Sequence, residues 1–459
     1  MSFGNKILKY QDDIMKDLAQ LVAIPSVRGK AAEGQPFGKE CADALSCILN
    51  RADQMGFATK NVGNYAGHAE YGEGDEVAAV VTHMDIVPAG EGWETDPFTL
   101  TQKGNLYFGR GTADDKGAAI VALYCLKVLK EENVPAKRRL RAIFGAGEET
   151  GSEDLEKYLE SEQLPVMAFT PDSDYGICNR EKGILRFCVS GSKNDSKVIS
   201  EFVSGTVVNA VPSKAVCTIR CSDEQYADLQ RVSSEAKGDF HFEKTHDGAR
   251  ITSIGKASHA MQPQEGFNAA AYLIKLLTEV FSPDELGSLM RFVSERIGTE
   301  LDGSTLGIRQ EDSHSGALTL NLGLFNMGTN FASAGFDVRY PVTSNGEQIF
   351  SAVSAQAAEF GLDATLNADT KPLFLPESSS FITLLQDSYA AVTGKQAELY
   401  ATGGGTYARA FKGNAVAFGL FFPGEPDRRL HNTGEHIDIE YFMLHAQVCL
   451  EAMYRMLTA

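Results

Sequence analysis

The sequence lacks several features that mark other classes of protein. No apolar run approaches the length of a bilayer-spanning helix, and residues 1–6 lack the charged-then-apolar pattern of a signal peptide. The eight cysteines form no Cys-x-x-Cys pair, so we expect buried free thiols in a reducing cytoplasm. Basic residues are not in excess either, since 42 Lys and Arg stand against 61 Asp and Glu. The resulting charge of −19 argues against nucleic acid and anionic membrane as partners.

Chain length and the order of apolar segments indicate two domains. At 459 residues the chain is too long for one typical hydrophobic core. Within residues 1–181, buried-strand patterns such as Val77–Val81 alternate with helical ones, which predicts an α/β fold with a mostly parallel sheet. Residues 182–377 mix strands and helices differently and predict an inserted α+β domain, long enough for two similar halves. The alternation of helical and strand patterns returns in residues 378–459, so we expect the first domain to be discontinuous.

Histidines and acids follow the ends of several predicted strands. His83 and Asp85 come directly after Val77–Val81, and Glu148 and Glu149 follow the next strand in a glycine-rich turn. Binding groups of open α/β sheets collect at the carboxyl ends of strands, so these side chains are candidates for one site. The glycine-rich turn does not match the Gly-x-Gly-x-x-Gly spacing of a dinucleotide site, which disfavours an oxidoreductase.

Three further stretches complete the set. Asp114 lies between glycines at the start of a predicted helix, and Asp172 follows a fourth strand, with Asp174 as the fallback. Downstream, His431 and His436 are five residues apart, so we expect one of them to be a ligand. Taken singly, each feature has an ordinary alternative, such as a surface histidine or a carboxylate that caps a helix.

Two histidines, three acids and one further glutamate form a ligand set for two divalent cations that share one carboxylate. Nitrogen and oxygen ligands without thiolate favour Zn²⁺, with Mn²⁺ or Co²⁺ as alternatives. Asp85, two residues after His83, could accept the second N–H of that imidazole and fix its tautomer.

In this order the stretches resemble the co-catalytic metallopeptidase family of carnosinase, aminoacylase, desuccinylases and bacterial dipeptidase V, the Xaa-His dipeptidase branch above all. The likeness covers nearly the full length and is most specific at Thr82–Pro88, Gly109–Gly117 and Glu148–Gly151. It implies a zinc-exopeptidase-like catalytic domain with an inserted lid domain. It also implies a cis peptide bond between Asp114 and Asp115.

The resemblance further implies a role for each matching residue. One cation would be held by His83, Asp114 and Asp172, and the other by Asp114, Glu149 and His431. Glu148 would be the general base that activates a metal-bridging water, and Asp85 would orient His83. In the lid, His259 and Asn209 would stabilise the oxyanion, while Arg339 and the backbone of Gly405 would bind the substrate carboxylate.

The function implied by the resemblance is hydrolysis of dipeptides with a free N-terminus, including β-alanyl ones, by a two-metal dipeptidase. Its only partner would be a small peptide. N-acyl amino acid deacylation or desuccinylation at the same site is the alternative, and a catalytically silent metal-binding protein is a rival from another class. Dimeric relatives have a shorter lid, so the long insert here predicts a monomer.

Overall fold

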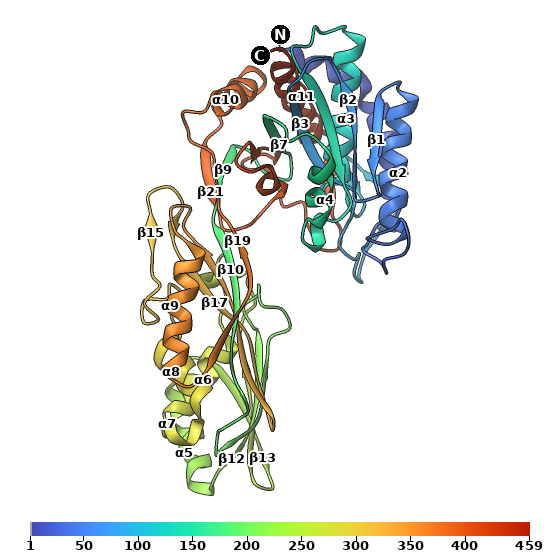
Figure 1. Cartoon of the computed structure of the whole chain (residues 1–459). Helices are drawn as coiled ribbons and strands as arrows, with labels where there is room; N and C mark the ends of the chain where they lie inside the picture. The colour runs from blue at the N-terminus through green and yellow to red at the C-terminus, as the bar shows by residue number, and fades with distance from the viewer. Residues whose placement is uncertain (1) are drawn as a thin grey trace. The chain divides into compact units, whose positions relative to one another are not determined.

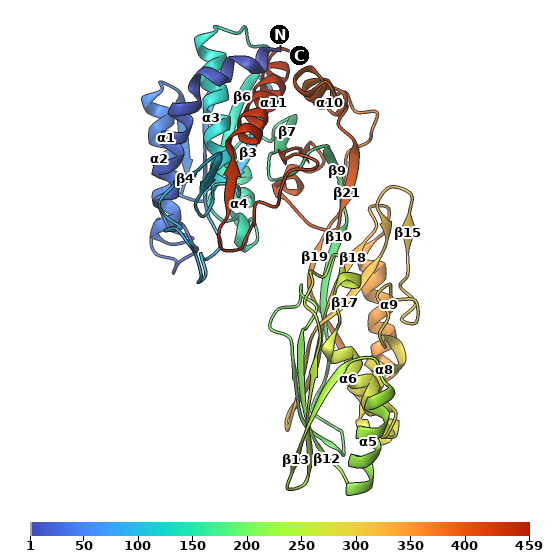
Figure 2. The same ribbon diagram turned by 180° about the vertical axis from the view of Figure 1, so that it is seen from behind.

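The computed structural model describes residues 2–459, which form two compact units (Figures 1 and 2). Unit 1 comprises Met1–Asn179, Leu373–Tyr400 and Gly405–Ala459, and unit 2 comprises Arg180–Pro372 and Ala401–Gly404. No helix within residues 2–459 is long and apolar enough to cross a membrane.

Unit 1 is built on a nine-stranded sheet with the order β1-β2-β6-β3-β7-β22-β9-β20, and β21 also pairs with β9. The centre of this sheet, β6-β3-β7-β22, is parallel, which confirms the predicted α/β fold; β1, β2 and β9 pair antiparallel. The strands of the sheet are β1 (Ala58–Val62), β2 (Ala66–Tyr71), β3 (Val77–His83), β6 (Arg139–Gly145), β7 (Met167–Thr170), β9 (Ile177–Glu181), β20 (Leu373–Phe374), β21 (Leu399–Thr402) and β22 (Ala415–Ala417).

Helices cover both faces of the central strand β3, which is why its sequence is a continuous apolar run. Ala78 and Val80 belong to one core, packed against the larger helices, whereas Ala79 and Val81 belong to a second core on the other face. The first core includes residues of α1 (Gln11–Val22), α2 (Lys39–Gln54), α3 (Lys116–Glu131), α10 (Ser380–Thr393) and α11 (Ile439–Thr458). The second includes residues of α4 (Glu153–Ser161) and η4 (Tyr407–Phe411).

Small elements complete unit 1. They are the 3₁₀ helices η1 (Phe3–Tyr10) and η2 (Glu148–Thr150), a three-stranded sheet of β24 (His436–Asp438), β5 (Leu106–Phe108) and β4 (Thr101–Lys103), and the pair β8 (Ser173–Asp174) and β23 (Leu420–Phe421).

Unit 2 is one eight-stranded antiparallel sheet with its helices on one face (Figure 1). The strand order is β13-β14-β12-β11-β17-β18-β10-β19. The runs β11-β12-α5-β13 and β17-β18-α9-β19 each lead from a central strand to an edge strand, on opposite halves of the sheet. The strands are β10 (Gly183–Gly191), β11 (Ile199–Ser204), β12 (Lys214–Arg220), β13 (Asp239–Thr245), β14 (Gly248–Ile254), β17 (Thr319–Gly328), β18 (Phe331–Tyr340) and β19 (Asp363–Thr370).

The helices of unit 2 supply the apolar layer that buries this sheet on one side. Alternate residues of β10, Leu185, Phe187 and Val189, face that layer. The helices are α5 (Asp223–Glu235), α6 (Ala269–Thr278), α7 (Pro283–Leu286), α8 (Ser288–Arg296) and α9 (Gly346–Ala358), with the short elements η3 (Pro263–Glu265), β15 (Glu311–Asp312) and β16 (Gly316–Ala317) beside them.

Candidate metal centre

The candidate ligands of unit 1 lie at one edge of the parallel strands. His83 is the last residue of β3, Glu148 and Glu149 begin η2 just after β6, and Asp172 follows β7 by two residues. Parallel neighbours end at the same edge of a sheet, so the order of the strands alone brings these side chains together. Asp114 precedes α3, and its peptide bond to Asp115 is cis, as the family resemblance implies.

Asp114 lies between the two histidines. Its Oδ1 is 2.9 Å from His83 Nε2, and its Oδ2 is 2.9 Å from His431 Nε2. His431 Nε2 is also 3.1 Å from Glu149 Oε1, and Asp172 Oδ2 is 3.8 Å from His83 Nε2. One carboxylate thus presents a separate oxygen to each imidazole, as a bridging ligand must.

These residues offer the ligand types of a divalent-cation site. Ligand atoms of His83, Asp114 and Glu149 lie within 4.8 Å of one another, and so do those of His83, Glu148 and Asp172. Imidazole nitrogens and carboxylate oxygens are ligands that suit Zn²⁺, while Mn²⁺ also accepts such a set. His431 joins the first group through its contacts with Asp114 and Glu149.

The buried carboxyl groups of this cluster have shifted pKa values. Burial raises the pKa of Glu148 well above its usual range, and the Asp172 carboxylate adds to the shift. Burial also raises the pKa of Asp172 to about 7, together with the Asp114 carboxylate. Burial opposes ionisation of Asp114 too, but hydrogen bonds from His431 and His83 outweigh it and lower that pKa. A glutamate with a raised pKa binds a proton more readily than an ordinary glutamate, which suits a group that takes up a proton.

Asp85 contacts His83 through its backbone carbonyl and its carboxylate. His83 Nδ1 is 2.9 Å from the backbone carbonyl oxygen of Asp85 and 3.4 Å from its carboxylate. The two carboxylate oxygens accept hydrogen bonds from the backbone N–H groups of Glu148 and Glu149, each at 3.1 Å. Both the carbonyl and the carboxylate therefore lie at the imidazole, and the carboxylate also holds the turn that carries the candidate base.

The two alternative ligand candidates, His436 and Asp174, are not members of the candidate ligand groups among the described residues. His436 is in β24, where its Nδ1 is 2.9 Å from the carbonyl of Gly434 and its ring is 5.0 Å from that of Phe108. Asp174 lies in β8 and is absent from both ligand groups found among the described residues.

Sequence reasoning missed the carboxylate of Glu435. This buried residue accepts hydrogen bonds from the backbone of the loop that carries Asp114 and pairs with buried Arg110 at 2.6 Å. Both residues lie inside stretches chosen for other reasons, one for His431 and the other for Asp114. A carboxylate that accepts backbone N–H groups has no characteristic spacing in the sequence, so only the fold could assign this role to Glu435.

The remaining candidate residues group mainly in unit 2. The N–H of Ala260 donates to the carbonyl of Asn209 at 2.9 Å, which sets the segments of Asn209 and His259 side by side. His259 Nδ1 accepts the N–H of Met261 at 3.1 Å, so the proton of a neutral ring is on Nε2.

Arg339 is buried on β18 and is held by a neighbouring carboxylate. Its Nε and Nη2 donate to the two oxygens of Asp337, and its Nη1 donates to the carbonyl of Gly403 at 2.7 Å. Gly405 belongs to unit 1, where an added Cβ would lie 2.8 Å from Arg409 Nε.

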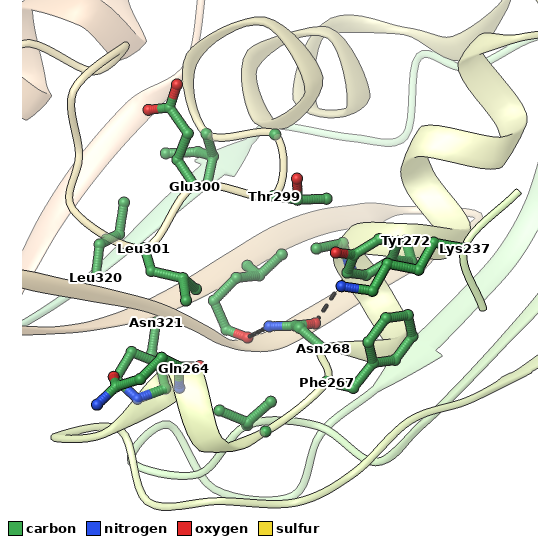
Figure 3. Close-up of a pocket in the computed structure, with 17 residues that line it drawn as sticks. Lys237, Gln264, Phe267, Asn268, Tyr272, Thr299, Glu300, Leu301, Leu320 and Asn321 are labelled. Atoms are coloured by element: carbon green, nitrogen blue, oxygen red, sulfur yellow. Dashed lines mark hydrogen bonds between the residues drawn. The ribbon is translucent and has the colours of Figure 1, made fainter.

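Asn321 of β17 supports the segment of Asn209. Its Nδ2 donates to the carbonyls of Val208 and Ala210, both at 3.0 Å, on either side of Asn209. Asn321 also lines a cavity of about 170 Å³, shown in Figure 3, where the amide of Asn268 donates to the carbonyl of Leu322 at 2.8 Å. All the residues that line the cavity belong to unit 2.

Comparison with known proteins agrees with this architecture. Residues 79–455 match the family model described as Peptidase family M20/M25/M40. The Beta-Ala-Xaa dipeptidase of Lactobacillus delbrueckii subsp. lactis is 33% identical over 456 residues, which cover 97% of this chain and 96% of the relative.

Solved structures show the same fold at low identity. Human carnosine dipeptidase 1 superposes with a TM-score of 0.59 at 14% identity and covers 99% of both chains. Aminoacylhistidine dipeptidase from Vibrio alginolyticus superposes with a TM-score of 0.56 at 13% identity and covers 95% of this chain and 96% of its own.

Proposed function

The chain belongs to Peptidase family M20/M25/M40, and we propose that it hydrolyses dipeptides with a free N-terminus by means of two divalent cations. The observation on which the proposal depends is the Asp114 carboxylate between His83 and His431, with Glu148 in the same cluster. The name of the Lactobacillus relative supports dipeptides as substrates and supports β-alanyl dipeptides among them.

We assign His83, Asp114 and Asp172 to one cation and Asp114, Glu149 and His431 to the other, with Zn²⁺ as the first choice and Mn²⁺ or Co²⁺ as alternatives. A bound pair of such cations would polarise the scissile carbonyl and lower the pKa of a water molecule to about 7. Glu148 takes the proton from the attacking water and returns it to the amine that leaves. Its raised pKa and the fixed backbone of its turn support this role.

The residues of unit 2 are proposed to act on the substrate itself. The Nε2–H of His259 and the amide of Asn209 would donate to the oxyanion that forms on the substrate carbonyl. Arg339 and the backbone N–H of Gly405 would bind the carboxylate of the dipeptide. We also propose that the enzyme is a cytoplasmic monomer, because the inserted unit is long and the cysteines are free thiols.

Replacement of Glu148 tests the proposal. Glu148→Gln keeps the size of the side chain but removes the proton acceptor, so kcat for dipeptide hydrolysis should fall by about 10²- to 10⁴-fold. Metal content, measured by mass spectrometry of the purified protein, should not change. Glu153→Gln alters an exposed glutamate of the following helix and serves as the matched control. A Glu148→Gln variant with wild-type kcat would exclude this mechanism.

The substrate panel also decides the chemical class. A set of dipeptides, with and without β-alanyl residues, is compared with N-acetyl and N-succinyl amino acids at the same concentration. Cleavage of the dipeptides at the higher kcat/KM supports the dipeptidase, whereas preferential release of acetate or succinate would assign the site to deacylation.

A further inference from the structure

We infer that Glu435 is a positioning residue, which fixes the loop of Asp114 so that the Asp114 carboxylate can bridge two cations. The inference rests on the proposed function in one respect, the assignment of Asp114 as the shared ligand. Glu435 itself lies outside both groups of candidate ligands among the described residues.

The carboxylate of Glu435 is saturated by donors from a single loop. Oε1 accepts the N–H groups of Ala113 at 2.9 Å and Asp114 at 3.2 Å. Oε2 accepts the N–H of Gly111 at 3.0 Å and Nη1 of Arg110 at 2.6 Å. The backbone carbonyl of Glu435 also accepts the N–H of Gly109 at 3.1 Å. With both oxygens occupied in this way, Glu435 holds the loop and does not present a lone pair to a cation.

The loop needs such an acceptor because it is buried, and an unpaired buried N–H group is unfavourable. The N–H of Thr112 donates to the carbonyl of Gly109 at 3.3 Å, whereas those of Gly111, Ala113 and Asp114 donate to Glu435. Gly111 has φ of +83°, a left-handed conformation that favours glycine and turns successive N–H groups toward one side. A single carboxylate, 1% exposed, satisfies three of these groups at once.

Arg110 extends the same contact to the two neighbouring stretches. Its Nη2 lies 3.3 Å from the carbonyls of Pro88 and Ala89 and 3.2 Å from that of Asn432. Pro88 is the last residue of the stretch Thr82–Pro88 that carries His83, and Asn432 directly follows His431. The buried pair of Glu435 and Arg110 therefore connects the three segments that hold His83, Asp114 and His431. A hydrogen-bonded ion pair of this kind fixes geometry as well as contributing energy.

The test measures cation binding by the full-length chain, without any peptide substrate. Metal-free protein is titrated with Zn²⁺ against a chromophoric chelator. In Glu435→Gln, an NH₂ group replaces one oxygen and opposes the N–H donors of the loop. We expect affinity for at least one of two Zn²⁺ ions to fall by about 10- to 100-fold, the usual effect when a group that orients a ligand is lost.

Glu451 provides a matched control for loss of a buried carboxylate. It accepts the N–H of Gly4 at 3.1 Å and pairs with Arg455 at 3.0 Å in the same unit, without contact to the candidate ligands. Glu451→Gln should lower the thermal midpoint but leave Zn²⁺ affinity unchanged. If Glu435→Gln does not fold, Glu435→Asp replaces it, since the shorter side chain cannot reach both pairs of donors and should show the same loss.

The outcomes separate this inference from the proposed function. Wild-type Zn²⁺ affinity in a folded Glu435 variant would overturn the inference and leave the dipeptidase proposal intact. Equal loss of affinity in Glu451→Gln would also overturn it, because the effect would then follow general destabilisation. A wild-type chain that binds two Zn²⁺ ions but cleaves no dipeptide would refute the function, while a loss confined to the Glu435 variants would still support the inference.

Discussion

At the scale of single residues, two imidazoles outside the metal cluster couple stability to pH. His68 and His445 are buried. His68 Nδ1 shares a hydrogen bond of 2.7 Å with the hydroxyl of Tyr158, and His445 Nδ1 shares one of 2.9 Å with the hydroxyl of Tyr175. Burial lowers the pKa of His68 to about 4 and that of His445 to about 3. Both rings are therefore neutral in the folded chain at pH values where the unfolded chain already binds protons.

We predict that the contribution of each of these two imidazoles to the free energy of unfolding falls as the pH drops from about 6.5 toward 4. Over this range each imidazole contributes a slope of up to about 1.4 kcal/mol per pH unit, because the unfolded chain binds one more proton. Denaturant unfolding at several pH values, in the presence of chelator, measures the slope. His445→Gln should reduce it, whereas His246→Gln, at an exposed position, should not. An unchanged slope in His445→Gln would contradict the prediction.

The candidate site could be predicted residue by residue only where a side chain follows a strand end or matches a family motif. His83, Asp114 and Glu149 were found in this way, and the structure places them in one cluster. Glu435 could not be found, because what it recognises is the backbone of a loop more than three hundred positions away. Spacing and the family resemblance placed the carboxylate of Asp85 at the imidazole of His83, 3.4 Å away, but its hydrogen bonds to the backbone of Glu148 and Glu149 followed only from the fold.

At the scale of elements, the end of β6 is packed too closely for any side chain. A Cβ at Gly145 would collide with the hydroxyl of Tyr407 and the carboxylate of Asp154. That carboxylate accepts the N–H groups of Ala146 and Gly147, both at 2.8 Å, and the hydroxyl of Tyr407. The turn between β6 and Glu148 therefore depends on the absence of a side chain at Gly145.

We predict that Gly145→Ala lowers the free energy of unfolding by about 1–3 kcal/mol, as is typical for overpacking of a tight core. It should also reduce kcat, since the turn that carries Glu148 must shift. Gly29→Ala is the control, because its added methyl group would have no neighbour closer than 3.6 Å. Urea unfolding of both variants gives the comparison, and equal stability of the two would refute the packing argument.

Elements were predictable in proportion to how much apolar sequence they bury. The strand β3, Val77–His83, is wholly buried, and its apolar part Val77–Val81 was expected as a buried strand. The strand β1 was missed because four of its five residues are exposed, so its sequence has no alternation to detect. Such edge strands are set by pairing with their neighbours, and the sequence of the strand itself does not encode the antiparallel edges of a mainly parallel sheet.

At the scale of the whole molecule, the fold gathers several carboxylates of an acidic chain at one edge of one sheet. The formal charge of −19 includes several acids that the fold buries together at the ends of β3, β6 and β7. Buried like charges repel strongly, so the cluster needs compensation by cations or by protons. Burial, with the neighbouring Asp114 carboxylate as the second cause, raises the pKa of Asp172 to about 7. Cation binding should therefore stabilise the folded chain as well as enable catalysis.

The central claim is that two divalent cations held by this cluster are required for dipeptide hydrolysis. The most direct measurement follows hydrolysis of a dipeptide and metal content in parallel, while chelator is added and divalent cations are then returned. We predict two cations per chain, loss of turnover as they are removed, and recovery on return of Zn²⁺, Mn²⁺ or Co²⁺. Full turnover by protein that retains less than about one cation per ten chains would contradict the account.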